Sequence, residues 1–108
     1  MSGDRQVLSS GLAEEEGVRG REGEIMVKAL QLRSGDEIAR IQKDVAERMI
    51  IILRVTPLAQ KNVDELKVAV EQLYEFATSI GGDIARLGEE RIVITPPGVR
   101  IWRGSLSQ

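Results

Sequence analysis

The side chains best suited to acid–base or metal chemistry in this sequence are carboxylates that occur in adjacent groups: Glu14-Glu15-Glu16, Asp36-Glu37, Asp64-Glu65 and Glu89-Glu90. Catalysis by paired carboxylates needs two groups held in a desolvated cleft with separated pKa values. Adjacent residues on a helix instead point about 100° apart, and acids in a first helical turn complement the helix dipole. The acidic run at 14–16 lacks the fixed oxygen cage that a divalent cation needs. No catalytic residue and no metal site are therefore expected.

Two absent residue types narrow the function further. The 108 residues include no histidine and no cysteine, so the commonest general base and metal ligand, disulfides and thiolate chemistry are all missing. We therefore predict a protein that is not an enzyme and has no cofactor. The longest apolar run, Met49–Leu53, has five residues, against about 20 for a membrane span. No signal-peptide pattern opens the sequence, so a cytoplasmic location is expected.

A chain of this length fits one domain. Residues 1–24 hold six acids and three arginines with few apolar side chains, which predicts a disordered N-terminal segment. Residues 25–104 carry the periodic pattern of a core domain, and residues 105–108 form a short tail.

The core domain alternates strand-like and helix-like patterns. Ser34 with Glu37, and Asn62 with Glu65, have the spacing of a capping box at a helix start, while Gly81-Gly82 is typical of a helix end. The expected order is a strand from Ile25 or Met26, a helix after Ser34, a strand Met49–Val55 ended by Pro57, a helix after Asn62, strands Ile84–Leu87 and Arg91–Thr95 joined at Gly88-Glu89-Glu90, and an optional strand Val99–Trp102. This is an α/β two-layer sandwich of order β-α-β-α-β-β, with an optional last strand.

Right-handed crossovers would place both helices on one face of the sheet. The strand Met49–Leu53 is nevertheless apolar on both sides, because alternate residues point to opposite faces. If the second face stayed in water, the domain would lose roughly 1.5–3 kcal/mol of burial free energy for each large side chain left exposed. A homodimer that buries this face is expected, with Ile50, Ile52 and Ile94 as its sheet-face residues. Coverage by residues 1–23 folding back is the alternative.

The segment Gly81–Ile101, GGDIARLGEERIVITPPGVRI, resembles the closing segment of the SepF family, the FtsZ-binding cell-division adaptors. The run Arg33–Ile38 and the apolar run Met49–Val55 agree with the first half of that family's domain, so the resemblance spans about Met26–Ile101. It implies a dimeric adaptor, peripheral at the division site, which holds the C-terminal tail of FtsZ in a largely apolar pocket and links the FtsZ ring to the membrane. FtsZ tails are short peptides that mix acidic and apolar residues.

The resemblance also implies particular site residues. In relatives a basic residue on the strand after Gly-Gly and an apolar residue that starts the next strand line the tail pocket; these positions are Arg86 and Ile92. Bacterial members carry a glycine six residues before the Gly-Gly pair, where dimers pack into filaments. Glu75 stands there, which predicts a dimer that does not polymerise and favours the archaeal branch. Residues 1–17 are acidic rather than basic and amphipathic, so a membrane-binding helix is not evident.

A second class of protein shares this order of elements. Alba-type chromatin proteins use it to bind DNA, so a dimeric nucleic-acid-binding or regulatory domain is the alternative function. The acidic centre of the turn at Glu89-Glu90 and the net charge of −2 argue against nucleic acid, which requires a cationic surface.

Overall fold

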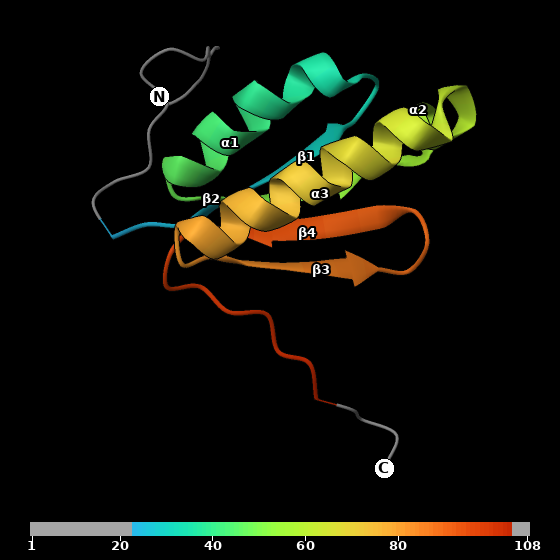
Figure 1. The fold of residues 1–108 in the computed structure, drawn as a ribbon. Helices are drawn as coiled ribbons and strands as arrows, with labels where there is room; N and C mark the ends of the chain where they lie inside the picture. Colours follow the sequence, from blue (N-terminus) through green and yellow to red (C-terminus); the bar gives the residue numbers. More distant parts are fainter. Residues whose placement is uncertain (1–22, 105–108) are drawn as a thin grey trace, which may run out of the picture.

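The computed structural model describes residues 23–104 (Figure 1). Its elements are, in order, β1 (Met26–Gln31), the 3-10 turn η1 (Gly35–Glu37), α1 (Ile38–Ala46), β2 (Met49–Arg54), α2 (Thr56–Lys61), α3 (Val63–Ser79), β3 (Asp83–Leu87) and β4 (Arg91–Thr95). Residues 1–22 of the segment that we predicted to be disordered lie outside the described residues. The predicted tail at 105–108 also lies outside them.

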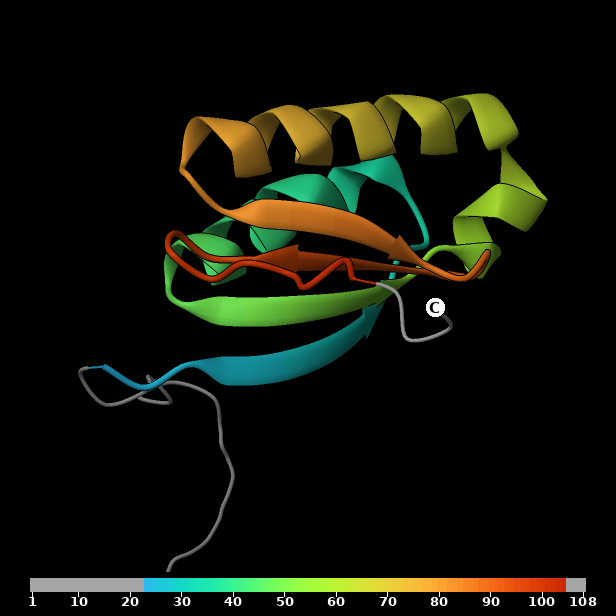
Figure 2. The same cartoon turned by 90° about the horizontal axis from the view of Figure 1, so that it is seen from below.

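The four strands form one sheet in the order β1-β2-β4-β3. β1 and β2 are parallel, whereas β4 runs antiparallel to both β2 and β3. Seen along the sheet, α1 and α3 lie on the same face (Figure 2). The predicted mixed α/β class is confirmed, and the other face of the sheet carries no helix within the described residues.

Polar side chains start the helices as their spacing predicts, but Glu65 binds a more distant partner than a capping box does. Ser34 Oγ accepts a hydrogen bond from the Asp36 amide, and Asn62 Oδ1 accepts one from the Glu65 amide at 3.0 Å. Glu65 Oε2 then accepts from the Gly35 amide at 2.7 Å. This bond ties the start of α3 to the turn that precedes α1.

The sequence analysis missed α2. We expected Pro57 only to end a strand, yet β2 ends at Arg54 and Pro57 lies in the first turn of a six-residue helix. Proline fits there because the first helical amides have no intrahelical acceptor. Leu58 of this helix is fully buried in the core, so burial stabilises a helix too short to be stable by propensity alone.

The core lies between the helices and one face of the sheet. Ile51 and Leu53 of β2 stand opposite Ile94 and Ile92 of β4, and none of the four is more than 4% exposed. The expectation that Ile94 lies on the same face as Ile50 and Ile52 is therefore wrong. Antiparallel pairing brings Ile94 beside Ile51, under the helices, and it is Val93 that stands beside Ile52 on the uncovered face.

The optional strand Val99–Trp102 is absent. After Thr95 the chain turns at Pro96–Gly98, and residues 99–104 leave the sheet beyond β3 as a segment without regular structure (Figure 1). We call residues 99–104 the C-terminal arm. Side chains rather than a strand ladder hold it, because Thr95 Oγ1 donates to the Val99 carbonyl at 2.6 Å.

The two glycines after α3 make different demands on the backbone, which gives a first prediction. Gly81 has a φ of +78° with open space around it, whereas a Cβ on Gly82 would clash with the Thr95 carbonyl oxygen. Gly81→Ala should cost roughly 1–2 kcal/mol of unfolding free energy through left-handed strain. Gly82→Ala should cost about 3 kcal/mol or more, since β4 must move. Urea unfolding of both variants measures this; equal losses would contradict it.

Candidate functional site

The two expected tail-pocket residues are cross-strand neighbours. Arg86 of β3 pairs with Ile92 of β4 in register, so both side chains lie on the helix-covered face. Arg86 is exposed, and its guanidinium donates to the carbonyls of Gly88 and Glu89 at the hairpin turn. Ile92 is only 4% exposed and belongs to the core. Arg86 is therefore accessible to a ligand, whereas Ile92 is a buried core residue beside it.

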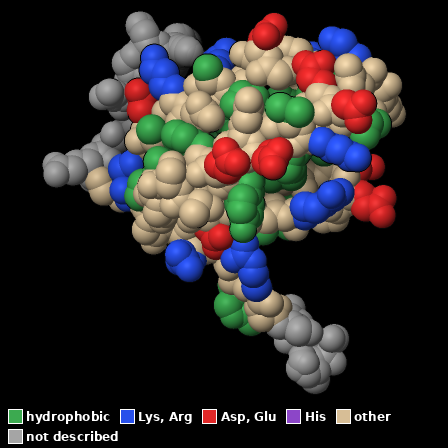
Figure 3. Space-filling model, in the orientation of Figure 1, with side chains coloured by type: hydrophobic (Ala, Val, Ile, Leu, Met, Phe, Trp, Pro, Cys, Tyr) green, Lys and Arg blue, Asp and Glu red, His purple; other side chains and the backbone are tan. Residues whose placement is uncertain are grey.

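The helix-covered face that carries Arg86 also carries exposed apolar side chains of α3. This helix contacts β3 and β4, and its flank towards α1 carries Gln72, Phe76 and Ser79. Helical spacing puts a second row on the opposite flank, above the β3 edge. Figure 3 looks onto this face and shows Lys and Arg side chains, with Asp and Glu side chains beside them, at the hairpin end of β3 and β4. We call the following set the α3–β3 surface: Val63, Lys67, Val70 and Tyr74 of α3 with Ile84 and Arg86 of β3.

Exposure separates the members of the α3–β3 surface into a floor and a rim. Val63 and Tyr74 are 55% and 60% exposed, which is unusual for large apolar side chains. Val70 and Ile84 are half-buried against the core and form the floor between them. Lys67 and Arg86 are exposed at the rim. The surface thus combines apolar contact area with positive charge.

Asp83, the first residue of β3, holds the C-terminal arm. Its carboxylate accepts bonds from both guanidinium nitrogens of Arg103, at 2.8 and 3.0 Å, and from the Ile101 amide at 2.9 Å. The Arg103 bonds, then the Ile101 amide, hold the pKa of Asp83 well below its usual range, and desolvation acts in the opposite direction. The pKa of Arg103 is raised, chiefly by Asp83 and to a lesser degree by Tyr74 nearby.

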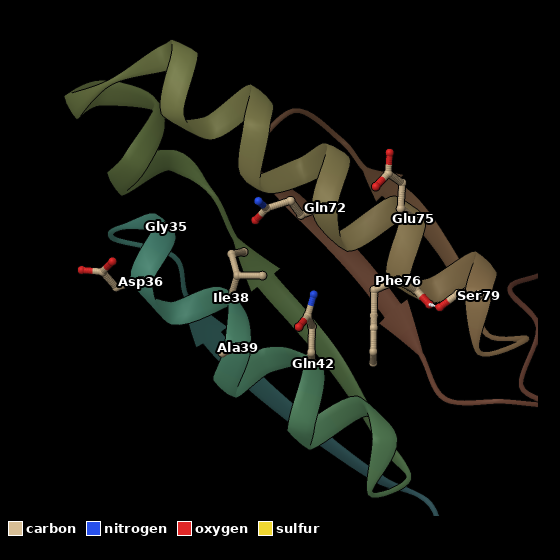
Figure 4. A pocket seen from close by; sticks show the side chains of 9 residues that line it. All are labelled: Gly35, Asp36, Ile38, Ala39, Gln42, Gln72, Glu75, Phe76 and Ser79. Carbon is tan, nitrogen blue, oxygen red and sulfur yellow. Dashed lines mark hydrogen bonds between the residues drawn. The ribbon is translucent and has the colours of Figure 1, made fainter.

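A hollow lies between α1 and α3. It is a shallow groove of about 640 Å³, with Phe76 and Gln42 directed into the space between the helices (Figure 4). Glu75 is exposed at its rim, on the outward side of α3 as expected from the sequence. The remaining lining residues are Gly35, Asp36, Ile38, Ala39, Gln72 and Ser79. Residues 23–104 contain no cluster of acids able to hold a metal ion.

The uncovered face of the sheet is apolar in its centre. Ile50, Ile52 and Val93 are only partly exposed there, because neighbouring strands shield them. The edges are more open: Val27 of β1 is 62% exposed and Leu87 of β3 is 53% exposed. This face offers a broad apolar area to a partner.

Comparison with known proteins agrees with this architecture. Residues 27–101 match the sequence profile of the family described as Cell division protein SepF. No curated protein sequence matches the chain. Among solved structures, a SepF-like protein from Archaeoglobus fulgidus superposes with a TM-score of 0.71 at 19% identity, over 78% of this chain and 100% of that one.

Two further archaeal structures share the fold. A SepF-like protein from Pyrococcus furiosus has a TM-score of 0.66 at 26% identity, over 73% of this chain and 95% of its own. Cell division protein SepF from Methanobrevibacter smithii, solved in complex with FtsZ-CTD, has a TM-score of 0.64 at 21% identity, over 73% and 99%.

Fold and surfaces together define a small α/β domain with an exposed sheet face and a charged apolar helix flank. The profile match extends over most of the chain, and the chain belongs to the SepF family of cell-division proteins. No helix within residues 23–104 is long and apolar enough to cross a membrane.

The sequence predicted Arg86 as a site residue but named no residue of α3 for this surface. The signal was present, because Val63, Val70 and Tyr74 recur at helical spacing beside the predicted core stripe. We had no reason to separate them from the core until the structure showed Val63 and Tyr74 exposed.

The arm attachment predicts a dependence of stability on acid. Because Asp83 has a lowered pKa in the folded state, its contribution is complete above the unfolded-state value of about 3.9 and declines as the pH falls towards the lower folded value. Asp83→Asn should therefore be less stable than the parent at pH 7, and the gap should narrow from pH 5 to pH 2. Urea midpoints across this range test it. A gap independent of pH would rule out the ionised pair as the cause.

Proposed function

We propose that this chain is a cell-division adaptor that binds the C-terminal tail of FtsZ, and that it does so as a homodimer. The observation that carries the proposal is the family match over residues 27–101, together with a fold shared with a relative solved with FtsZ-CTD bound. A dimeric nucleic-acid-binding or regulatory domain is the competing function.

The α3–β3 surface is the proposed tail-binding site. Its exposed apolar side chains, Val63 and Tyr74, can bury the apolar residues of a peptide. Arg86 and Lys67 supply cations at the rim, which suit the acidic residues of the same peptide. Such pairing sets specificity and association rate more than total affinity. Ile92 contributes as the core residue that holds Arg86 and the hairpin in register.

The uncovered sheet face is the proposed dimer interface. Ile50 and Ile52 are there, Val93 replaces Ile94 beside them, and all three stay partly accessible to water in the single chain. Burying them against a second copy removes apolar area from water at roughly 25 cal/mol per Å². Two sheets packed face to face about 10 Å apart are a common solution for such surfaces.

The membrane link is the third part of the proposal, and family membership alone supports it. The positions where relatives carry an amphipathic helix correspond to residues that the structure does not describe. The link would place the protein peripherally at the division site, in the cytoplasm.

Titration with two ligands tests the function directly. The full chain should bind a labelled FtsZ tail peptide in fluorescence anisotropy and should not bind duplex DNA at the same salt concentration. DNA binding without peptide binding at high micromolar protein would instead favour the nucleic-acid alternative.

Variants of Arg86 and Ile92 test the site within that assay. Arg86→Glu should weaken peptide binding about tenfold at low salt, and the loss should shrink at high salt because screening weakens charge contacts. Arg40→Glu, an equally exposed charge reversal on α1, is the matched control and should bind normally. Ile92→Ala should lose about 2–5 kcal/mol of stability as well as affinity. Parent-like affinity in folded Arg86 and Ile92 variants would exclude this site while leaving the family assignment intact.

Glu75 leads to a prediction about assembly. A contact between α3 helices of two dimers would bring like charges together and desolvate the carboxylates, which is costly. Multi-angle light scattering should therefore give a dimer mass that does not rise with protein concentration. Glu75→Gly should raise it if the missing small residue is what blocks growth, while Glu75→Gln separates loss of charge from loss of bulk. Filaments formed by the parent protein at neutral pH would refute this role of Glu75.

A further inference from the structure

Two apolar features of the uncovered face lie at opposite edges of the sheet. At the β1 edge, Val27 is 62% exposed and its pairing with Ile50 puts it on the uncovered face, while Ile25, just before β1, is 41% exposed. At the β3 edge, the C-terminal arm carries Trp102, the only tryptophan of the chain, which is 71% exposed. A large aromatic side chain this exposed is a common anchor in protein interfaces.

Hydrogen bonds to β3 fix the position of the C-terminal arm. Asp83 side chain bonds to the Ile101 amide and to Arg103 fix the arm on both sides of Trp102. Arg103 also donates to the Ile84 carbonyl at 2.6 Å. Because Asp83 pairs with Thr95, two residues from Val93, its side chain belongs to the uncovered face. The arm that it binds leaves the β3 edge on the side away from the helices (Figures 1 and 2). Fixing the arm in advance lowers the entropy cost of using it in an interface.

The strand register puts the arm anchor and Val27 in one row across the sheet. Val27 pairs with Ile50. Ile51 pairs with Ile94, so the next antiparallel step brings Ile50 beside Thr95, which pairs with Asp83. The row therefore runs from Val27 at the β1 edge to Asp83 at the β3 edge.

A two-fold axis parallel to the strands maps this row onto itself with its ends exchanged. When two copies pack face to face about such an axis, the β3 edge of one lies over the β1 edge of the other. The arm of each copy then meets the exposed Ile25 and Val27 of its partner. The alternative axis, perpendicular to the strands, would instead bring the arm over the hairpin end near Leu87 of the partner.

We infer that the C-terminal arm is a reciprocal interface element, with Trp102 of one copy packed against Ile25 and Val27 of the second copy. The inference rests on the homodimer of the proposed function and adds its symmetry and its anchor residue. With the two-fold axis parallel to the strands, Trp102 of each copy covers Val27 of the other. The same contact therefore forms twice in the dimer and buries the most exposed apolar side chain at each edge.

Cysteine cross-linking tests the geometry cleanly, because the parent chain has no cysteine. Val27→Cys and Trp102→Cys are made separately in the full chain, mixed at equal concentration, allowed to exchange subunits and oxidised mildly. Three strand spacings of about 4.8 Å separate β1 from β3, whereas a disulfide needs Cα atoms within about 7 Å. We expect the mixture to give a disulfide-linked dimer containing one copy of each variant, well above the amount from either variant alone.

Leu87→Cys, also exposed on the uncovered face, is the matched control. A mixture of Leu87→Cys with Trp102→Cys should cross-link poorly; strong linkage there would overturn the inference in favour of the perpendicular axis. Light scattering on each variant shows whether the dimer itself forms. A dimer without the 27–102 link would refute the arm contact but leave the proposed function standing.

The fluorescence emission of Trp102 tests the same contact in the parent chain, without any substitution. Dilution that dissociates the dimer should shift the emission to longer wavelength as the indole returns to water. An unchanged spectrum across the dissociation range would overturn the inference. So would a blue shift caused by anionic phospholipid vesicles at a concentration where the chain is monomeric, since Trp102 would then be a lipid contact.

Discussion

The structure depends on one constraint: β2 is a central strand that is apolar on both faces, and the helices of the described chain cover only one of them. Ile51 and Leu53 lie in the core against β4, while Ile50 and Ile52 remain at the surface. A domain this small has little interior to spare. The uncovered face is thus the natural place for a second copy, and the helix-covered face is left for other partners.

The two proposed contacts use separate faces of this small domain. The α3–β3 surface is charged at its rim and apolar in its floor, which suits a short peptide that must bind and leave. The uncovered sheet face is apolar in its centre, as stable interfaces between identical subunits tend to be. Arg86 on one face and Val93 on the other are contributed by neighbouring strands. Any shift in register would therefore disturb both surfaces together.

The start of β3 connects these regions. Asp83 binds the arm, Thr95 accepts the Asp83 amide at 2.8 Å and donates to Val99, and Gly82 allows the close approach to Thr95 that this arrangement needs. Arg103 also occupies the Ile84 carbonyl on the outer edge of β3. A carbonyl occupied in this way is not open to strand addition from another chain.

Local patterns in the sequence were sufficient for the four strands, for the helices α1 and α3 with their starts at Ser34 and Asn62, and for the two-sided apolar character of β2, because each depends on neighbours along the chain. Three features needed the tertiary structure. Antiparallel pairing decided that Ile94 lies under the helices, since a strand pattern names two faces without saying which is covered. Burial of Leu58 decided that the residues around Pro57 form a helix. The position of α3 over β3 decided that the exposed α3 flank with Tyr74 lies on the same face of the domain as Arg86, because contacts between distant elements depend on how the sheet and helices pack and not on spacing within either one.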